Sequence, residues 1–330
     1  ILEAAKRNRI DGIMTLATDM PMRAVAAVAA EMGLVGIDAD TALKATNKAE
    51  MRKALQVAGV PIPKFFKVSD KEEYYEAVKQ FDASFIAKPV DSSGSRGVFE
   101  VIDITDRKLI EEAYDYCRPF SREGDVIVEE YMSGPEVSVE TISIDGECHV
   151  IQITDKLTTG APHYVEMGHS QPTRLSKETA DRIAEVARKA NKAIGIKNGP
   201  SHTEIIVTGE GPKVVELGAR LGGDNIATHL VPLSTGVDMV ECCIKIALGE
   251  EPDIEAKWSK GSAIRYFRQH AGIIKAIDGI EEAEKIRGIR QISIVHNVGE
   301  EITDVIDSGS RMGFGIAQDE NADEAIADCT

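Results

Sequence analysis

The stretch from Ser201 to Asp224 decides how the rest of the chain is interpreted, and it runs S-H-T-E-I-I-V-T-G-E-G-P-K-V-V-E-L-G-A-R-L-G-G-D. Two apolar, β-branched runs, His202 to Val207 and Lys213 to Leu217, flank the short turn Gly209 to Gly211. Such runs on either side of a glycine-containing turn are typical of a β-hairpin. The stretch therefore predicts two antiparallel strands joined by a three-residue loop.

Two glutamates occupy matching positions in this hairpin. With a three-residue loop, Thr208 lies opposite Pro212, and counting back along both strands places Glu204 opposite Glu216. Directly opposed Cβ atoms lie about 4.5–5.5 Å apart on one face, where like charges are destabilising unless something offsets them. Mg²⁺ binds carboxylate oxygens and often shares its ligand shell with substrate phosphates. The hairpin therefore predicts a Mg²⁺ site at these two glutamates, with a solvated acidic hairpin as the alternative.

Three further residues of the stretch favour the metal site. Arg220 follows Glu216 closely enough to reach the same place. Gly222 and Gly223 have no side chain, so that a ligand could approach the backbone there. Together these residues favour a ligand-binding metal site over a solvated acidic hairpin.

Composition sets wider limits. With 330 residues, of which 43% are hydrophobic, the chain is long enough for two or three domains. The net charge of -17 argues against nucleic acid as a partner, because phosphate binding by a whole surface needs a basic patch. No apolar run approaches the length of a membrane span. Five cysteines without C-x-x-C spacing predict reduced thiols and a cytoplasmic protein: Cys117, Cys148, Cys242, Cys243 and Cys329.

The first residues predict part of an α/β unit. Residues 11–16 have the pattern of a buried strand, and Met22 to Met32 that of an alanine-rich helix closed by Gly33. A unit this short cannot bury both faces of a strand. The first residue is not methionine, and no signal peptide follows it. We therefore expect residues 1–42 to be the C-terminal part of an N-terminal α/β domain.

Two lysines and a flexible loop predict phosphate binding. Lys48 lies in the first turn of a helix that begins near Thr46, where a solubilising surface charge is the alternative. Lys88 interrupts the strand F-I-A-K-P-V, where an unpaired charge is costly to bury, so it needs an anionic partner. The loop of residues 91–98 is rich in glycine and serine and could close backbone N–H groups over phosphates. It has neither P-loop nor Rossmann spacing. Together with Lys88 before it, the loop is better interpreted as a lid over a nucleoside triphosphate.

The next segment predicts how a nucleotide base would be held. The strand of residues 125–131 runs into the connector Met132-Ser133-Gly134-Pro135, whose free backbone groups could pair with an adenine edge. Glu136, at the start of the following strand, could accept hydrogen bonds from ribose hydroxyls. An ordinary surface connection between two strands is the alternative for this segment.

Six motifs taken together resemble the ATP-grasp superfamily across nearly the whole chain: N-K-x-x-M-R, G-V-P-I-P-K, F-I-A-K-P, S-S-G-S-R-G-V, V-E-E-Y-M-S-G-P-E, and H-T-E-I-I-V with V-V-E-L-G-A-R-L-G-G. The resemblance implies a mixed α/β (α+β) ATP-grasp fold. Residues 1–42 would then be the remnant of a Rossmann-like domain, and residues 43–252 the ATP-grasp domain, with a nucleotide lid at about 65–130. The apolar periodicity also predicts an amphipathic helix from Lys177 to Ile194 that ends at Gly195. Residues 253–330 are predicted to be a small C-terminal α+β domain, with short strands at 262–267, 272–277, 291–296 and 314–317 and a helix at 279–286.

The resemblance also implies roles for individual residues. Glu204 and Glu216 would hold Mg²⁺, with Mn²⁺ as a substitute, and Arg220 would be catalytic. Many superfamily members carry asparagine two residues after the second glutamate as a further metal ligand, whereas this chain has Gly218, which leaves open whether one or two metals bind. The residues expected to bind ATP are Lys48, Lys88, Ser92, Ser93, Gly94, Ser95, Gly97, Glu129, Glu130, Tyr131, Met132 and Glu136.

Within the superfamily, the segment from Lys156 to Thr173, K-L-T-T-G-A-P-H-Y-V-E-M-G-H-S-Q-P-T, looks like that of the L-amino-acid ligases, which join two amino acids into a dipeptide. Glu166 and His169 match positions that line the substrate site in that group, as does Arg220. A polar surface loop is the alternative. The implied partners are a small carboxylate and a small amine, with no membrane or nucleic acid, and the resemblance suggests a homodimer.

The activity that follows is ATP-dependent ligation of a carboxylate to an amine through an acyl phosphate. Two alternatives stay open at this point. The chain could be another ATP-grasp enzyme, such as a carbamoyl-phosphate synthase, a phosphoribosylglycinamide synthetase or a biotin-dependent carboxylase. It could also be a nucleotide-binding protein without catalysis, which Gly218 favours and which Arg220, Lys88 and the two glutamates argue against.

Overall fold

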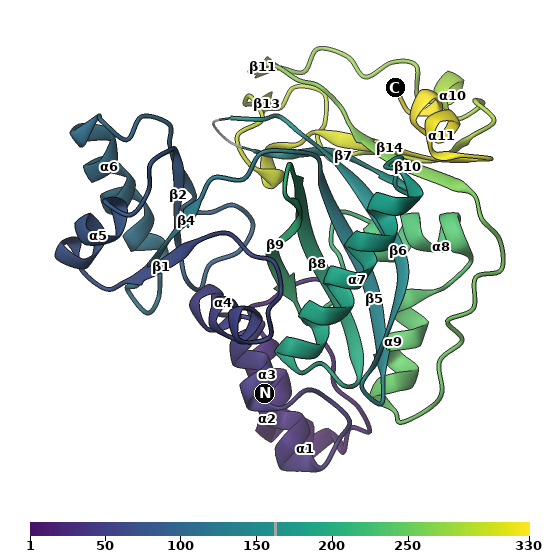
Figure 1. Cartoon of the computed structure of the whole chain (residues 1–330). Coiled ribbons are helices and arrows are strands. Elements are labelled where there is room, and N and C mark those ends of the chain that lie inside the picture. Colours follow the sequence, from purple (N-terminus) through teal and green to yellow (C-terminus); the bar gives the residue numbers. More distant parts are fainter. Residues whose placement is uncertain (162–163) are drawn as a thin grey trace.

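An eight-stranded antiparallel sheet forms the centre of the computed structural model, which describes residues 1–161 and 164–330 (Figure 1). Its strand order is β12-β14-β10-β7-β6-β5-β8-β9. Strands β5 to β9 form one end of the sheet, and the C-terminal strands β10, β12 and β14 form the other end. The strands are β5 Glu136–Ile144, β6 Glu147–Thr158, β7 Glu166–Gln171, β8 Gly199–Thr208, β9 Gly211–Gly218, β10 Gly261–Tyr266, β12 Ile289–Ile294 and β14 Gly313–Asp319.

One face of this sheet is covered by the helix α7, Lys177–Ile194 (Figure 1). Its buried residues Ile183, Ala187 and Ile194 recur at helical spacing and pack with Val137 and Val139 of β5. Ser176 caps its first turn, and Gly195 ends it in the left-handed region at φ 98°. These bounds confirm the predicted helix. Further helices complete this layer: α2 Met22–Met32, α3 Ala39–Lys44 and α4 Lys48–Val57.

The opposite face is covered over only part of its length. There Ile142, Leu221 and Ile264 pack with the helical segments that follow the hairpin. Those segments are η2 Ile226–Leu230, α8 Val231–Thr235 and α9 Met239–Ala247. Along a strand, alternate side chains face opposite sides, so Val137 and Val139 point to α7 while Glu136 and Glu140 point to this second face. The uncovered end of the second face therefore carries charged side chains.

A four-stranded sheet with its own core lies to one side of the central sheet (Figure 1). It comprises residues 65–130, the range predicted for the nucleotide lid, and we call it the lid. Tyr74, Phe85 and Val128 are buried between its sheet and its two helices. Its elements are β1 Phe65–Val68, α5 Lys71–Val78, β2 Phe85–Pro89, β3 Phe99–Val101, α6 Arg107–Cys117, η1 Arg118–Phe120 and β4 Val126–Glu130, in the strand order β1-β4-β2-β3.

The hairpin β8–β9 differs from its prediction in a way that preserves the glutamate pair. Thr208 is opposite Gly211 rather than Pro212, so the loop has two residues instead of three. That loop alone would place Glu204 opposite Val215. A β-bulge between Glu204 and Ile205 inserts one extra residue on β9 and restores the pairing of Glu204 with Glu216. The predicted pair is thus confirmed, although the predicted loop is wrong.

The N-terminal residues are helical or irregular. Helix α2 and its end at Gly33, which has φ 67°, confirm the predicted helix, and α1 comprises Leu2–Asn8. The predicted strand at residues 11–16 is wrong, because no strand of the described chain pairs with it. Instead, Leu16 O accepts a hydrogen bond from Leu221 N at 3.1 Å, and Met14 packs against the core on the second face of the sheet. These contacts attach the segment to the residues that follow β9.

Most of the C-terminal strands contribute to the central sheet, whereas residues 272–273 and 301–302 pair in a separate two-stranded sheet. Strand β10 pairs with both β7 and β14, so the chain after residue 260 completes the sheet begun by β5 to β9. The predicted strand at 272–277 is reduced to two residues, and the predicted helix at 279–286 is also shorter. The remaining elements are β11 Gly272–Ile273, α10 Ile280–Ala283, β13 Glu301–Ile302, η3 Ser308–Ser310 and α11 Ala322–Asp328.

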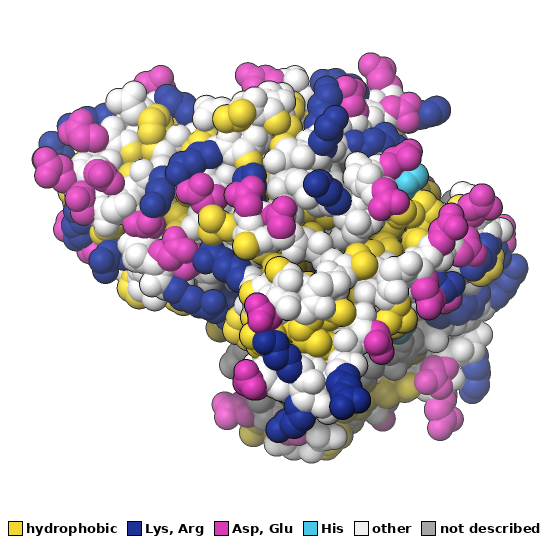
Figure 2. Space-filling model, turned by 90° about the horizontal axis from the view of Figure 1, so that it is seen from below, with side chains coloured by type: hydrophobic (Ala, Val, Ile, Leu, Met, Phe, Trp, Pro, Cys, Tyr) yellow, Lys and Arg dark blue, Asp and Glu magenta, His cyan; other side chains and the backbone are white. Residues whose placement is uncertain are grey.

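The surface charge and the state of the cysteines can be compared with what the composition predicted. Figure 2 shows acidic and basic side chains interspersed over the face it presents, without a continuous basic band among the described residues there. None of the helices in residues 1–161 and 164–330 combines the length and the apolar character that crossing a membrane requires. All five cysteines are free thiols.

Candidate active site

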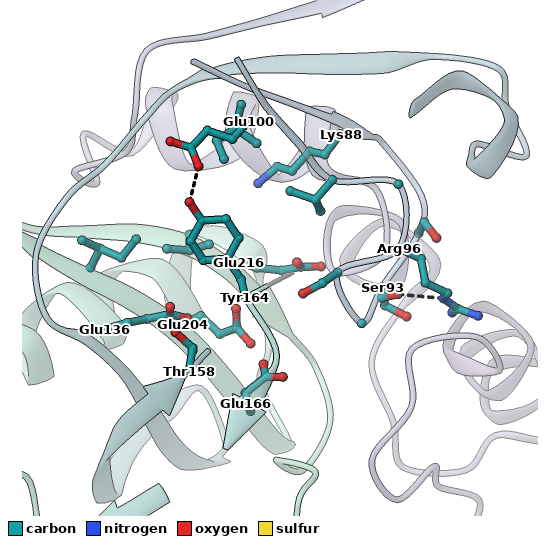
Figure 3. Close-up of a pocket in the computed structure, with 18 of the residues that line it drawn as sticks. Lys88, Ser93, Arg96, Glu100, Glu136, Thr158, Tyr164, Glu166, Glu204 and Glu216 are labelled. Atoms are coloured by element: carbon teal, nitrogen blue, oxygen red, sulfur yellow. Dashed lines mark hydrogen bonds between the residues drawn. The ribbon is translucent and has the colours of Figure 1, made fainter. Parts of the chain in front are cut away.

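A cavity of about 760 Å³ lies between the lid and the uncovered end of the central sheet's second face (Figure 3). It brings together side chains from the lid, from β5 to β9 and from residues 306–308 of the C-terminal part. Every residue that the sequence predicted for the site lines this cavity except His169: Lys48, Lys88, Ser92, Ser93, Gly94, Ser95, Gly97, Glu129, Glu130, Tyr131, Met132, Glu136, Glu166, Glu204, Glu216 and Arg220.

Lys48 connects the predicted metal site with the predicted phosphate loop. Its ammonium lies 2.8 Å from Glu216 Oε1 and 2.6 Å from the carbonyl oxygen of Ser92. The side chain is only 9% exposed, so the alternative of a solubilising surface charge is wrong. Asn47 caps helix α4 at this point and thereby fixes the backbone of Lys48. A cation held here can reach both a carboxylate-bound metal and the phosphates of a nucleotide.

Lys88 has the anionic partner that its strand position required. Its Nζ lies 2.6 Å from Glu129 Oε2, and the other carboxylate oxygen of Glu129 accepts a 2.5 Å hydrogen bond from Arg52 Nε. Arg52 also donates to the carbonyl oxygen of Val215, within the bulge of β9, at 2.7 Å. The side chain of Glu129 is therefore engaged in an ion-pair network, and its backbone lies in β4, paired with β1 on one side and β2 on the other. Arg52 ends the motif N-K-x-x-M-R, but no role was predicted for it from the sequence.

The charges of this network leave room for an anion. Burial by itself would raise the pKa of Glu129, but the positive charges of Arg52 and Lys88 lower this pKa to about 2. Burial, helped by Arg52 and Lys48, lowers the pKa of Lys88. Two basic side chains thus share one carboxylate, and a phosphate group in the adjacent cavity would balance the excess positive charge.

The loop of residues 91–98 covers one wall of the cavity. Gly94, Ser95 and Gly97 have positive φ angles, which turn the backbone sharply. Asp91 anchors the start of the loop by accepting hydrogen bonds from the backbone N–H groups of Arg122 and Glu123 at 3.1 Å. Within the loop, Arg96 Nε donates to Ser93 O at 3.0 Å (Figure 3). The loop is thus held at its base while its glycine and serine residues face the cavity.

The connector after β4 has unused backbone groups. Tyr131 N donates to Ser84 O at 3.3 Å, whereas the backbone of Met132 makes no hydrogen bond within the described chain. Gly134 has φ 146°, and a Cβ atom there would lie 2.1 Å from Val207 O, so only glycine fits. The connector therefore passes close to β8 and presents the free N–H and C=O of Met132. Its contact with adenine stays a prediction.

Lys156 is the main residue that the sequence prediction missed. Its ammonium lies 2.5 Å from Glu136, 3.4 Å from Glu204 and 3.6 Å from Glu166, and its side chain is 4% exposed. Figure 3 shows these three carboxylates gathered on one side of the cavity. A lysine on the inward face of a strand gives the same signal as Lys88, so Lys156 could have been found in the sequence.

The carboxylates of the hairpin could hold a divalent cation. Three carboxylates share the single ammonium group of Lys156, and Glu204 has Glu216 directly opposite it. Carboxylate oxygens are the ligands that Mg²⁺ and Mn²⁺ prefer. Burial alone would raise the pKa of Glu204, but Lys156 and His202 lower this pKa well below its usual range. The carboxylate is therefore ionised and able to coordinate a metal ion. Glu204 and Glu216 are the residues that would hold it.

His202 and Glu140 form a second buried pair beside Glu204. His202 Nδ1 lies 2.8 Å from Glu140 Oε1, and its Nε2 lies 3.5 Å from Glu204 Oε1. Burial opposes protonation, but the carboxylate of Glu140 raises the pKa of His202 to about 9. A Cβ atom at Gly222 would come within 2.6 Å of Glu140 Oε2, so this glycine makes room for the pair rather than for a ligand. Their spacing could have indicated both members, because His202 lies two residues before Glu204 and Glu140 lies four residues after Glu136, so each shares a strand face with a predicted site residue.

His169 lies outside the cavity lining, which corrects its predicted position. Its side chain is 2% exposed, and Nε2 lies 3.2 Å from Asp224 Oδ2. Asp224 in turn receives two hydrogen bonds from Arg311, each of 2.8 Å. Arg311 also donates to the backbone oxygen of Glu166 at 2.9 Å. His169 therefore belongs to a buried network that joins the C-terminal part to the strand carrying Glu166.

Tyr164 joins the lid to the segment resembling the L-amino-acid ligases. Its hydroxyl donates a hydrogen bond to Glu100 Oε2 on β3 (Figure 3). Both residues line the cavity, and Thr159 N bonds to Val165 O at 2.9 Å at the base of the same loop. Residues 162 and 163, which belong to the predicted segment, lie outside the described residues.

Comparisons with known proteins agree with the fold. Residues 81–228 match the family model described as an ATP-grasp domain, and residues 265–330 match L-amino acid ligase C-terminal domain 2. The first range contains most of the cavity lining. The second contains the C-terminal strands and Arg311.

Three known proteins illustrate the similarity. An alanine–anticapsin ligase of Bacillus subtilis (strain 168) is 28% identical over 278 residues, which cover 77% of this chain. An L-arginine-specific L-amino acid ligase of Bacillus subtilis is 24% identical over 290 residues, covering 87%. The crystal structure of an L-amino acid ligase from Bacillus licheniformis superposes with a TM-score of 0.85 at 26% identity, over 98% of this chain and 79% of the other. The chain spans 57% and 69% of the two sequence relatives' own lengths.

Proposed function

We propose that this chain, an ATP-grasp protein that resembles the L-amino-acid ligases, is an ATP- and Mg²⁺-dependent ligase that joins a carboxylate to an amine through an acyl phosphate. The observation that carries the proposal is the arrangement of charges in one cavity. The carboxylates around Lys156, together with Glu216 opposite Glu204, lie at one side, and the cationic network of Lys88 lies at the other. A metal-bound nucleoside triphosphate has the charges that this arrangement complements.

The reaction has two steps. A carboxylate oxygen of the first substrate attacks the γ-phosphorus of ATP, which gives an acyl phosphate and releases ADP. The amine of the second substrate then attacks the acyl carbon, forming an amide and releasing inorganic phosphate and a proton. Bound Mg²⁺ supplies neutralisation of the negative charge on the phosphates.

The chain's own residues position the substrates and balance their charge. Lys48 and Lys88 hold the phosphates from the side of the lid, and the loop of residues 92–97 excludes water above them. The free backbone of Met132 pairs with the adenine edge, and Glu136 accepts from the ribose hydroxyls. These contacts fix the nucleotide so that the γ-phosphate faces the glutamates of the hairpin.

Arg220 serves the second step. It lines the same cavity and presents a guanidinium group that is ionised at any physiological pH. A fixed cation of this kind stabilises the oxygen on which negative charge develops when the amine attacks. Arg220 is therefore the catalytic residue, in the sense that it contacts the reacting atoms.

Amino acids are the substrates we propose. The names of the relatives support this choice, since they include an alanine–anticapsin ligase and L-amino acid ligases. Glu166 lies at the cavity beside Lys156 and can bind the ammonium group of an amino acid. We further propose that the protein acts in the cytoplasm, where ATP is available and where its five free thiols stay reduced, and that it is a homodimer.

The test is phosphate release from ATP and Mg²⁺, screened against single and paired L-amino acids. We expect release that requires two amino acids, together with a dipeptide product identified by mass spectrometry. Bicarbonate and phosphoribosylamine are separate controls. Release that depends on either of them would replace the proposed substrates while keeping ATP-grasp chemistry. Binding of ATP without turnover under every condition would contradict the ligase proposal.

A further inference from the structure

The guanidinium group of Arg220 is held by a residue from the other end of the chain. Its Nε donates to Asp19 Oδ1 at 2.8 Å, and its Nη1 donates to the backbone oxygen of Leu221 at 3.0 Å. The two side chains are 17% and 16% exposed. Within the described residues no protein group bonds to Nη2, which leaves this nitrogen available to a ligand. Two nitrogens of the fork are thus fixed while the side chain lines the cavity.

Gly218 provides the space that this arrangement needs. A Cβ atom at residue 218 would lie 2.9 Å from Asp19 Oδ1 and 3.1 Å from Arg220 Cγ. Those contacts are too short for carbon, so any side chain at position 218 would displace Asp19, Arg220 or both. The glycine that departs from the superfamily pattern is therefore explained by the carboxylate that lies above it.

The backbone around Asp19 is attached to the body of the protein. Leu221 N donates to Leu16 O at 3.1 Å, and Met22 N donates to Asp19 O at 3.0 Å at the start of α2. A Cβ atom at Gly12 would lie 2.8 Å from Ala247 O, so the segment also packs closely against α9. These contacts hold the carboxylate of Asp19 on a fixed support.

We propose that Asp19 is a positioning residue, which orients the guanidinium group of Arg220 toward the acyl group during amide formation. The inference rests on the proposed function. Its physical reason is competition, because Glu204 and Glu216 also attract Arg220 electrostatically. The ion pair with Asp19 keeps the guanidinium group of Arg220 away from these carboxylates and directs its Nη2 into the cavity. Without Asp19, the guanidinium would turn toward the metal-binding glutamates.

The experiment compares Asp19→Ala and Asp19→Asn with Asp11→Ala, an exposed acid of the same segment whose side chain makes no ion pair or hydrogen bond within the described chain. Outer-sphere partners that orient a functional group typically contribute about 10- to 100-fold. We expect Asp19→Ala to lower kcat for dipeptide formation by about that factor and to leave the Kd for ATP within about twofold. Asp19→Asn, which keeps an acceptor for Nε, should lose less. Asp11→Ala should behave like the wild type.

A crystal structure of Asp19→Ala provides a measurement that does not depend on activity. We expect the guanidinium of Arg220 to move toward Glu204 and Glu216, whereas an unmoved guanidinium would overturn the inference. Gly218→Ala is the second variant, because it crowds the same contact and should lower kcat even if Asp19→Ala fails to fold. Wild-type kcat in both Gly218→Ala and Asp19→Asn would also overturn the inference. Failure of the wild type to release phosphate with amino acids would instead overturn the proposed function, and the crystal structure would still decide where Arg220 points.

Discussion

Individual residues of this site act through charge that is buried and shared. Lys156 forms ion pairs with three carboxylates, and Glu129 forms ion pairs with two cations. Arg220 forms an ion pair with Asp19, which lies near the N-terminus of the chain. Removing one member of such a group leaves its partners buried without compensation, which costs more than a surface ion pair contributes. Substitutions that preserve shape but change charge are therefore the informative ones.

Arg220→Ala should abolish detectable amide synthesis. Loss of one group that stabilises a developing oxyanion typically lowers kcat about 10²–10³-fold. The affinity for ATP, measured by calorimetry, should stay close to that of the wild type, because Arg220 serves the second step. Arg287→Ala, which removes an exposed arginine remote from the cavity, is the matched control. Normal synthesis by the Arg220 variant would contradict its catalytic role.

Glu204→Gln and Glu216→Gln should each weaken metal binding. We expect the Mg²⁺ concentration for half-maximal phosphate release to rise at least about tenfold, because the amide keeps the shape of the carboxylate but loses its charge. A shift of the unfolding temperature by Mg²⁺ alone, without substrates, gives a second readout. Glu210→Gln, in the exposed turn of the same hairpin, should leave both measurements unchanged. A wild-type Mg²⁺ response in either variant would place the metal elsewhere.

At the scale of elements, one irregularity of the hairpin decides the geometry of the site. The bulge on β9 restores the pairing of Glu204 with Glu216 that a two-residue loop would otherwise displace by one position. It also directs the carbonyl oxygen of Val215 to Arg52, which links the hairpin to Glu129 of the lid. The bulge thereby joins the metal site and the phosphate site. Bulges often have this function next to active sites.

Tyr164→Phe should loosen the lid without unfolding it. The lost hydrogen bond to Glu100 is one of the contacts between the lid and the loop beside Glu166, and such a bond contributes about 0.5–1.5 kcal/mol. We expect the Kd for ATP to rise about threefold to tenfold. Glu100→Gln should have a similar effect, and the double variant should be no weaker than either single variant.

Tyr75→Phe, which removes a more exposed hydroxyl on the lid helix α5, is the control for this pair. Additive effects of Tyr164→Phe and Glu100→Gln on the Kd would mean that the two side chains act separately. That result would contradict a shared contact between the lid and the loop.

At the scale of the whole molecule, the central sheet brings distant segments to one cavity. Strands from residue 136 to residue 319 lie side by side in it, and the lid is joined to it through the ion pair of Glu129 with Arg52 of α4. Because Glu129 lies on β4 and its partners lie on α4 and β2, its charge stabilises the junction between the lid and the rest. The free energy of unfolding should therefore depend on the protonation of Glu129.

The sign of this dependence follows from the direction of the shift. The pKa of Glu129 falls from 4.5 to about 2 on folding, so its contribution is complete above pH 4.5 and is lost as the pH falls toward 2. A shift of this size corresponds to about 3 kcal/mol in total, of which about 2 kcal/mol is lost by pH 3. We expect the difference in unfolding free energy between wild type and Glu129→Gln, measured with urea, to shrink by about that amount between pH 6 and pH 3.

Glu111→Gln is the control for this measurement. Glu111 is a half-exposed acid of the lid helix α6, and its pairing with Lys71 contributes little at the surface. Its difference from the wild type should stay constant over the same pH range. If the difference for Glu129→Gln is also constant, Glu129 is not the ionised partner of Arg52 and Lys88.

The sequence by itself determined the local elements and most of the lining of the cavity. Helices α2 and α7 end at the predicted glycines, and the glutamates of the hairpin face each other as predicted. These features are encoded by neighbours in the chain, through capping residues and through the alternation of side chains in strands. The motifs for the nucleotide are local in the same sense, so they could be read without the fold.

Only the tertiary structure decided which partners the buried charges have. Asp19 contacts Arg220, which is 201 residues away in the sequence, and Arg52 contacts Glu129, which is 77 residues away. No local sequence pattern indicates either pair. The same holds for His169, whose position in the sequence indicated the cavity but whose ring contacts Asp224 instead. A charge is costly to bury without a partner, so the sequence can tell that a partner must exist. Which residue it is depends on how the strands and segments pack in three dimensions.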